Sequence, residues 1–261
     1  GGGLLNEAVD MTGLFITRGP VVQVRDSYGK VLPRSDRNPK VAYNGPLAVL
    51  TSRHSASASE ILAGALQNYG RALIIGNDTT HGKGSVQQVL PLEDYVLQPY
   101  SSKNKAGAAK LTIQKYYLPN GFSVQRKGVV SDISIPSIAD VTAVAEADLD
   151  NALAWDYIKP ARYFVEMTIK DSFVETLQNN SKQRQIQLEE FNFLKERIDW
   201  YQEREDQKAI SLNLEKRKQM MDQDKEFIDV MKDRQRVLAE VNFKGAEVKL
   251  DAILKEEAEN K

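Results

Sequence analysis

The chain has 261 residues, which is long for one compact domain and comfortable for two, and its hydrophobic share of 41% is enough to bury a core. Its 35 Lys and Arg residues nearly balance 36 Asp and Glu residues, so the net charge of -1 supplies no global positive field for nucleic acid. The absence of cysteine excludes disulfides, thiolate nucleophiles and cysteine-based metal sites. No run approaches the ~18 consecutive apolar residues of a membrane span.

Composition changes near residue 165. All nine prolines and fifteen of the sixteen glycines precede this point, whereas residues 166–261 hold 40 of the 71 charged side chains. Glycine and proline punctuate short strands and turns, and their absence permits long helices. We therefore expect an α/β domain over residues 1–142, a linker over 143–165 and an all-α extension over 166–261. Because the chain opens on three glycines without a methionine, we also expect it to be truncated.

In chain order, the hydrophobic pattern of the first part predicts two helices and several short strands. Helical spacing covers residues 4–15 and 59–69. Alternation over 21–25 followed by the turn Tyr28-Gly29-Lys30 predicts a hairpin. The further predicted strands are 47–50 and 72–75, both buried, then 86–90, 110–117 and 122–125, with a tight turn at Asn120-Gly121.

The second part carries apolar residues at helical intervals. No strict heptad persists for three or four repeats, so a coiled coil is not favoured. We expect a helical hairpin that packs on the first domain through Phe191, Leu194 and Ile198.

The segment that points to chemistry is Ser55-Ala56-Ser57-Ala58-Ser59-Glu60, between a predicted strand and a predicted helix. A serine there commonly caps the helix. Three serines exceed what a cap needs, and Ser59 alone would serve. Ser57 is then free to act as a nucleophile, with the amide of Ala58 placed to stabilise an oxyanion.

A serine nucleophile needs a base, and the residues alone leave two kinds open. His54 and His81 are the two histidines of the chain, and a Ser-His pair would be completed by Asp78, Asp94 or Glu60.

The other candidate base is Lys83, which stands between two glycines. On its own it would be read as a solvated turn lysine. If it is buried, its pKa falls from ~10.4 towards the ~7–8 useful for a general base.

Several segments together resemble the carboxy-terminal processing peptidases, a family of serine proteases that use a Ser-Lys dyad. The matching segments are residues 55–60, 64–71, 82–88 and 124–129, followed by Asp132-Ile133. Residues 151–156 and 210–213 resemble motifs of the long helical C-terminal extension that some members carry. The resemblance implies a protease core of crotonase-like mixed sheet with helices, followed by an all-α domain.

Carried over position by position, the resemblance makes Ser57 the nucleophile, Lys83 the general base and Gln87 the residue that orients the lysine. It implies an oxyanion hole formed by the backbone of Ala58 with that of Gly2 or Gly3. If residues 83–87 form a strand, side chains four apart share a face, so Lys83 and Gln87 would both point into the cleft.

The resemblance also carries expectations for the whole protein. It implies a hydrolase that cleaves proteins or peptides with apolar C-termini in the bacterial periplasm, with a possible adaptor protein and without metal or cofactor. Nucleic acid and integral membrane spans are not expected.

Two other functions remain in competition with an active Ser-Lys peptidase. One is a catalytically silent scaffold whose helical tail binds a partner, and the presence of Ser57, Lys83 and Gln87 argues against it. The weaker one is a Ser-His hydrolase.

Overall fold

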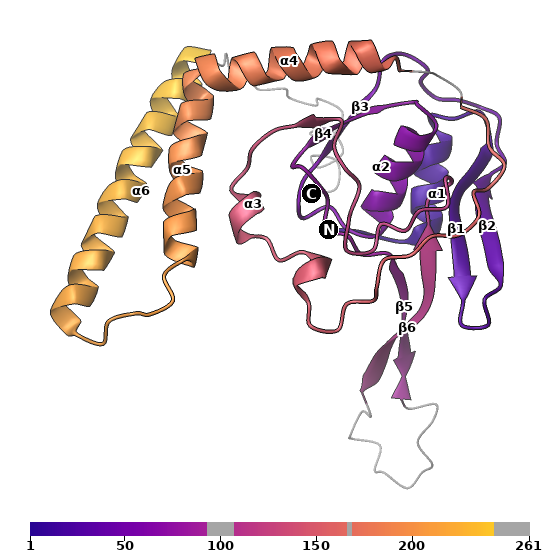
Figure 1. Ribbon diagram of the computed structural model, residues 1–261, viewed down its shortest axis with the longest axis horizontal. Coiled ribbons are helices and arrows are strands. Elements are labelled where there is room, and N and C mark those ends of the chain that lie inside the picture. Colours follow the sequence, from indigo (N-terminus) through magenta and orange to yellow (C-terminus); the bar gives the residue numbers. More distant parts are fainter. Residues whose placement is uncertain (93–106, 166–168, 243–261) are drawn as a thin grey trace, which may run out of the picture.

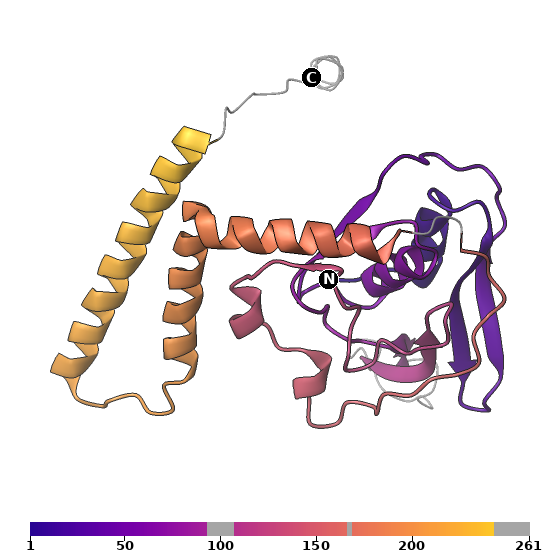
Figure 2. The same ribbon diagram turned by 45° about the horizontal axis from the view of Figure 1, so that its top comes forward.

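The computed structural model describes residues 1–92, 107–165 and 169–242 (Figure 1). A mixed α/β core is followed by long helices that extend away from it, as two views of the ribbon show (Figures 1 and 2). The predicted succession of an α/β core and an all-α region is confirmed.

The core contains an antiparallel sheet with the strand order β2-β1-β6-β5. Its strands are β1 (Gly19–Asp26), β2 (Val31–Asp36), β5 (Ser85–Pro91) and β6 (Ala108–Tyr117). β1 and β2 form the predicted hairpin, whose turn is held by N–H groups of Tyr28 and Lys30 that donate to the Asp26 carboxylate. Within the described residues, β5 is an edge strand of this sheet.

A second sheet consists of parallel strands in the order β3-β4-β7. These are β3 (Ala48–Thr51), β4 (Leu73–Gly76) and β7 (Ile133–Ser134). Ile74 of the central β4 is fully buried, as expected, but Leu50 of β3 is 80% exposed. The strand predicted over residues 47–50 is therefore present as β3, but its predicted burial is wrong, because β3 lies at the edge of the described sheet.

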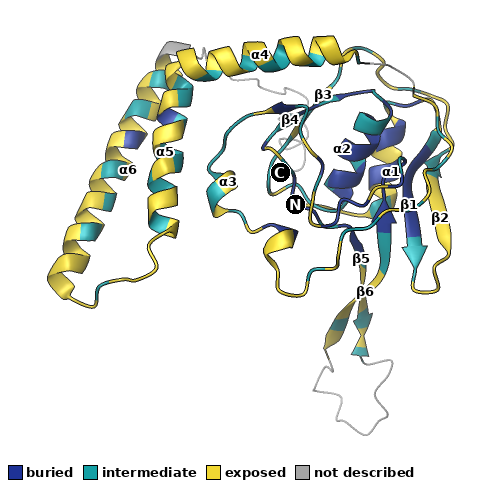
Figure 3. Ribbon diagram, viewed as in Figure 1, coloured by how far each residue is buried: buried dark blue, intermediate teal, exposed yellow. Residues whose placement is uncertain are grey.

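Two helices join the sheets into one core. α1 (Leu5–Gly13) and α2 (Ala58–Asn68) pack on each other, and α2 contacts both β1 and β4. α2 buries an apolar face that includes Ile61 and Leu66, as its helical spacing predicts. The buried residues gather around these helices (Figure 3).

Residues 122–125 do not form the predicted strand. Phe122 makes a single antiparallel bridge with Tyr157, after which the N–H groups of Lys127 and Gly128 donate to the Val124 carbonyl oxygen and turn the chain. The ladder stops because the neighbouring chain around Tyr157 is itself irregular.

The segment after β7 runs along the core. It contains α3 (Ala139–Thr142) and the short 3-10 helix η2 (Glu146–Asp148). Further on, the Trp155 indole N–H donates to the Ser123 carbonyl oxygen at 2.8 Å, and Asp156 accepts hydrogen bonds from Arg25 and Lys115.

The tail forms α4 (Asp171–Gln187), α5 (Glu189–Glu205) and α6 (Leu214–Asn242), so its predicted helical character is confirmed over the described residues. α5 and α6 make the expected hairpin, in which the rings of Trp200 and Phe227 stack with centroids 4.9 Å apart. Phe193 and Met231 are buried, whereas most of the remaining helix surface is exposed (Figure 3).

The tail meets the core at two places. The side-chain amides of Gln178 and Gln185 on α4 donate to carbonyl oxygens of Asp132 and Ser134 around β7, at 2.7 and 2.9 Å. α5 packs against α3, and its residues Phe191, Leu194 and Ile198 are partly buried. α5 of the hairpin thus contacts α3, and the polar docking of α4 adds to this contact; that Phe191, Leu194 and Ile198 make it stays a prediction.

No helix among residues 1–92, 107–165 and 169–242 is long and apolar enough to cross a membrane.

Leu66 of α2 tests this assignment of the core. Leu66→Ala is expected to lower the free energy of unfolding by about 2–5 kcal/mol, because the side chain is completely buried and its loss leaves a cavity. Leu212→Ala is the matched control, since Leu212 is 96% exposed in the loop between α5 and α6. Urea unfolding of the intact protein measures both, and equal losses would contradict the assignment.

Candidate active site

Ser57 stands at the turn between β3 and α2. It is the N-cap residue of α2, with φ of 55° and ψ of -113°. A left-handed conformation in a residue with a side chain costs on the order of 1–3 kcal/mol and persists only where neighbours hold it. Here the Ser57 N–H donates to the Glu60 carboxylate at 2.7 Å, and the Ser57 carbonyl oxygen accepts the N–H groups of Glu60 and Ile61. The first turn of α2 thus holds the unusual backbone of Ser57.

The two flanking serines have other partners. The Ser55 hydroxyl accepts a hydrogen bond from the Ser52 N–H at 3.1 Å, and the Ser59 hydroxyl donates to the Gly1 carbonyl oxygen at 2.8 Å. The expectation that Ser59 caps the helix is wrong, because Ser57 occupies the N-cap position.

Lys83 lies in a loop whose two glycines press against a second segment of chain. Gly82 has φ of +93°, and a Cβ atom there would lie 3.0 Å from the backbone of Arg126. A Cβ atom on Gly84 would lie 2.9 Å from the backbone nitrogen of Gln125. Both sequence neighbours of Lys83 are therefore positions at which a side chain would clash with neighbouring backbone.

The carboxylate of Glu60 joins the loops of Ser57 and Lys83. Glu60 is completely buried. Its Oε1 accepts from the Thr80 hydroxyl at 2.5 Å and from the Gly82 N–H at 2.6 Å, while its Oε2 accepts from the N–H groups of Ser57 and Lys83 at 2.7 and 3.0 Å. Burial raises the pKa of the Glu60 carboxyl, and these hydrogen bonds oppose the rise. One side chain thus holds the main chains of both loops.

Tyr116 of β6 makes a second connection between the same loops. Its hydroxyl lies 2.6 Å from the Lys83 carbonyl oxygen and 3.1 Å from the Ser57 carbonyl oxygen, and it can donate to either. Burial raises the pKa of Tyr116 well above its ordinary value, so the hydroxyl keeps its proton and remains a donor.

Ser57 and Lys83 line the same cavity, which has a volume of about 370 Å³. Gln87, Ala58 and Gly3 line it too, so five of the residues singled out from the sequence meet there. Its other lining residues are Gly3, Leu4, Leu5, Ile61, Ser85, Val86, Lys110 and Tyr116.

Gln87 belongs to β5, but Lys83 precedes that strand. The expectation that the two side chains share one strand face is therefore wrong, since a single strand does not carry both. They still line one cavity, because the Lys83 ammonium turns along the chain and donates to the Ser85 carbonyl oxygen at 3.0 Å.

The surroundings of Lys83 lower its pKa. Burial lowers the pKa of Lys83, the charge of Glu146 opposes this, the charge of Lys110 adds to it and the charge of Glu60 opposes it. The net direction is downward, which is the direction a lysine base requires.

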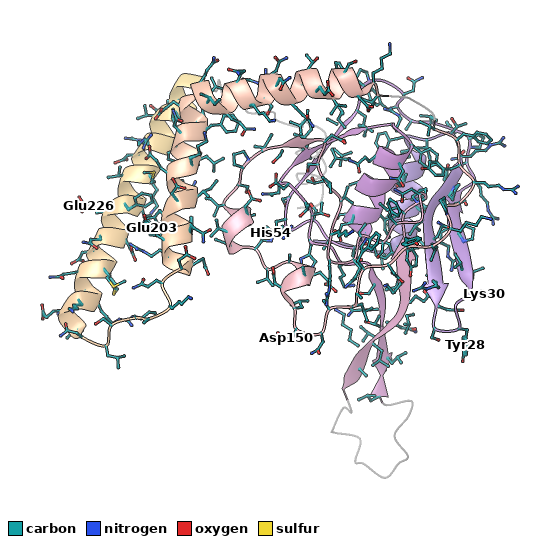
Figure 4. All side chains as sticks on the ribbon, in the orientation of Figure 1. Tyr28, Lys30, His54, Asp150, Glu203 and Glu226 are labelled. Atoms are coloured by element: carbon teal, nitrogen blue, oxygen red, sulfur yellow. The ribbon has the colours of Figure 1, made fainter. Side chains whose placement is uncertain are left out.

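The histidines do not share this cavity. Among the described residues, neither His54 nor His81 lines the cavity that holds Ser57. The Nε2 atom of His81 lies 3.5 Å from the Glu146 carboxylate, and His54 lies on the loop before Ser57, where it is exposed (Figure 4). Asp78 accepts a hydrogen bond from the Ser134 hydroxyl, and Asp94 lies outside the described residues.

The glycine-rich start of the chain lies against the serine turn. A Cβ atom on Gly2 would lie 2.5 Å from the Ala56 carbonyl oxygen and 3.1 Å from the Ser57 Cβ atom. Gly2 and Gly3 also line a second, mostly apolar cavity of about 340 Å³, together with Leu4, Met11, Val49, Leu50 and Leu62.

In the part of the chain that the structure describes, no group of three or more His, Cys, Asp or Glu side chains is arranged to hold a metal ion.

Sequence reasoning missed the structural roles of Glu60 and Tyr116. For Glu60 a signal was present, because the spacing Ser57-x-x-Glu60 is that of a capping box. For Tyr116 no local signal exists, since its two carbonyl partners lie 59 and 33 residues away in the chain.

Glu60→Gln tests the connection between the loops. An amide offers one acceptor oxygen where the carboxylate offers two, so buried N–H donors lose their acceptor and meet an NH₂ group instead. We expect the free energy of unfolding to fall by about 2–4 kcal/mol. Glu226→Gln, at an exposed position on α6 (Figure 4), is the control and should stay within about 0.5 kcal/mol of the parent. Similar urea midpoints for the two variants would contradict the role of Glu60.

Comparison with known proteins finds two families along the chain. Residues 1–135 match Peptidase family S41, and residues 139–261 match the C-terminal domain of tail specific protease (DUF3340). The predicted resemblance to carboxy-terminal processing peptidases with a helical extension is confirmed.

Individual relatives agree with this assignment. The chain is similar to the Tail-specific protease of Haemophilus influenzae, with 44% identity over 226 residues that make up 86% of this chain and 32% of that protein. It is also similar to the Carboxy-terminal-processing protease of Bartonella bacilliformis, with 39% identity over 51% of this chain and 28% of that protein.

A solved structure, the photosystem II D1 C-terminal processing protease, matches 52% of this chain and 32% of its own, with 34% identity and a TM-score of 0.44. The chain thus spans about a third of the length of the relatives it matches. On the match over residues 1–135, this chain belongs to peptidase family S41.

Proposed function

We propose that this chain carries the Ser-Lys dyad of a serine endopeptidase. The observation that carries the proposal is that Ser57 and Lys83 line one cavity while a single buried carboxylate, that of Glu60, holds both of their loops. The names of the relatives, which are proteases, support the same reaction class.

The reaction follows from the chemistry of the two side chains. Neutral Lys83 accepts the proton of the Ser57 hydroxyl while the serine oxygen attacks the scissile carbonyl carbon. The resulting ammonium then donates that proton to the leaving amine as the C–N bond breaks. A water molecule, deprotonated by the same lysine, cleaves the acyl-serine ester and regenerates both groups.

For the oxyanion we propose the backbone N–H of Ala58 together with that of Gly2 or Gly3. Ala58 is the first residue of α2, and Gly3, which comes shortly before α1, lines the same cavity as Ser57, so two helix N-termini lie near Ser57. Helix N-termini stabilise negative charge through their free N–H groups. The close packing of Gly2 against Ala56 supports a place for this segment at the reacting carbonyl.

Gln87 is proposed to orient Lys83 from the start of β5. An extended substrate would lie beside β5, whose outer edge carries no strand among the described residues. Backbone pairing with a strand edge tolerates varied sequences. This suits a protease that selects its substrates by their C-terminal end.

For the whole protein we propose protein or peptide substrates with apolar C-termini, a possible adaptor protein and a periplasmic location. The printed names of the relatives, "tail-specific" and "carboxy-terminal-processing", support the first of these. We also propose residues 1–142 as protease core, 143–165 as a linker that lies along it, and 166–261 as the helical extension.

The two competing functions have less support. A silent scaffold has no need of a lysine with a lowered pKa beside a serine in one cavity. A Ser-His hydrolase requires a histidine in that cavity, which neither His54 nor His81 provides.

The nucleophile is tested by two serine variants of the intact protein. Ser57→Ala is expected to abolish cleavage of an apolar-tailed protein and labelling by a serine-directed probe, with the fold intact. Ser55→Ala should be far milder, because the Ser55 hydroxyl accepts one hydrogen bond in the preceding turn. Equal loss in both variants would point instead to a structural role for the whole serine run.

The base is tested by pH and by charge. Lys83 must be neutral to accept a proton, so kcat/KM should rise with pH through a midpoint below the ordinary lysine value of ~10.4. Lys83→Arg should be inactive across the range, because guanidinium stays protonated. His54→Gln is the control and should keep substantial activity. Normal cleavage by Lys83→Arg together with an inactive His54→Gln would replace the lysine by a histidine as base.

A further inference from the structure

The segment that opens the C-terminal domain contacts the loop that carries Lys83. This segment includes α3 and η2, and it lies within residues 139–261, which match the C-terminal domain family. At one end, the Asn77 side-chain amide donates to the Asp140 carboxylate of α3 at 2.6 Å. Asn77 in turn accepts the N–H of Arg53, from the turn that precedes Ser57, at 3.0 Å.

At the other end of the loop the contacts centre on Glu146 and His81. The Glu146 N–H donates to the His81 carbonyl oxygen at 3.0 Å. The ring of His81 lies between two oxygens of the C-terminal segment, with Nδ1 at 3.1 Å from the Val144 carbonyl oxygen and Nε2 at 3.5 Å from the Glu146 carboxylate. Residues of the C-terminal domain therefore hold the loop at two points, Asn77 and His81, both of which precede Lys83 in the chain.

A buried glutamine, Gln125, forms hydrogen bonds both with Glu146 and with the glycine that follows Lys83. The Gln125 amide NH₂ donates to the Glu146 Oε1 atom at 2.8 Å, and the Gln125 carbonyl oxygen accepts the Gly84 N–H at 2.8 Å. Gln125 is completely buried and Glu146 is 9% exposed, so water competes little for these bonds. A chain of hydrogen bonds runs from Glu146 to the residue that follows the lysine.

We propose that Glu146 is a positioning residue through which the C-terminal domain holds and tunes the base-bearing loop. This inference rests on the proposed Ser-Lys function. α5 of the helical tail packs against α3. The proposal therefore connects the helical tail, through α3, to the active site.

The charge environment of Lys83 gives the proposal a measurable consequence. The charge of Glu146 raises the pKa of Lys83 and so opposes the larger effect of burial. The positive side chain that competes with Glu146 is Lys110 of β6, and the other negative one is Glu60 of α2. Other ionisable groups around the loop are the Tyr116 hydroxyl at the Lys83 carbonyl oxygen, the His81 ring at Glu146 and the Arg53 guanidinium at Thr79 and Thr80. Two further carboxylates are those of Asp78 on the loop itself and Asp140 at Asn77.

Two substitutions of Glu146 separate charge from geometry. Glu146→Gln keeps an acceptor oxygen for Gln125 but removes the charge, so the acid limb of the kcat/KM profile should move to lower pH by about half a unit. At a pH well below the midpoint, the variant should therefore reach a fraction of its maximal kcat/KM about three times that of the parent. Glu146→Asp keeps the charge but draws the carboxylate back from Gln125, so the maximum should fall several-fold while the midpoint stays near that of the parent.

The matched control is Asp150→Asn, which removes a carboxylate from the same segment at an exposed position (Figure 4). Its pH profile should coincide with that of the parent. All variants are measured in the intact protein against one apolar-tailed substrate, with thermal melting to verify the fold.

The outcomes separate this inference from the proposed function. Activity in Ser57→Ala would overturn the Ser-Lys function and this inference with it. An enzyme that needs Ser57 but shows no pH shift in Glu146→Gln, or an equal shift in Asp150→Asn, would overturn the role of Glu146 alone. If Glu146→Gln does not fold, a folded Glu146→Asp with the parent's maximum and midpoint overturns the proposal by itself.

Discussion

The structure of the site depends on one buried carboxylate. Removing an ionisable group such as Glu60 from water is costly unless hydrogen bonds replace its hydration. The four donors that do so come from the helix cap and from the loop of Lys83, at 2.5 to 3.0 Å. Satisfying this one group therefore requires the two loops to meet, and the cavity with Ser57 and Lys83 lies where they do.

This constraint explains why small residues surround the site. The main chain must approach closely if its N–H groups are to reach a carboxylate, and side chains at Gly82 and Gly84 would separate the loop from the segment that contains Gln125. The unfavourable backbone angles of Ser57 are held by the same carboxylate. A local conformational cost and a desolvation cost are thus offset by a single set of hydrogen bonds.

The boundary between the two families does not coincide with a physical gap. The C-terminal domain family begins at residue 139, yet Asp140 and Glu146 bind side chains on the loop that carries Lys83. The tail then leaves the core through α4, which docks by glutamine side chains and has no buried residue of its own. The contacts of Asp140, Val144 and Glu146 with the loop of Lys83 are hydrogen bonds or a charged contact made by specific atoms.

The sequence by itself determined the elements that rest on local pattern: the helix α2 that ends shortly before Gly70, the hairpin around Gly29, the helical tail, and Ser57 and Lys83 as candidates. Hydrophobic period, turn chemistry and motif spacing are local, so one chain is enough to see them. Tertiary structure decided what depends on distant partners. It left Leu50 exposed at a sheet edge, ended the pairing after Phe122, and brought Tyr116 and Glu146 to the loop of Lys83. Those outcomes follow from neighbours tens of residues away, which no local period encodes.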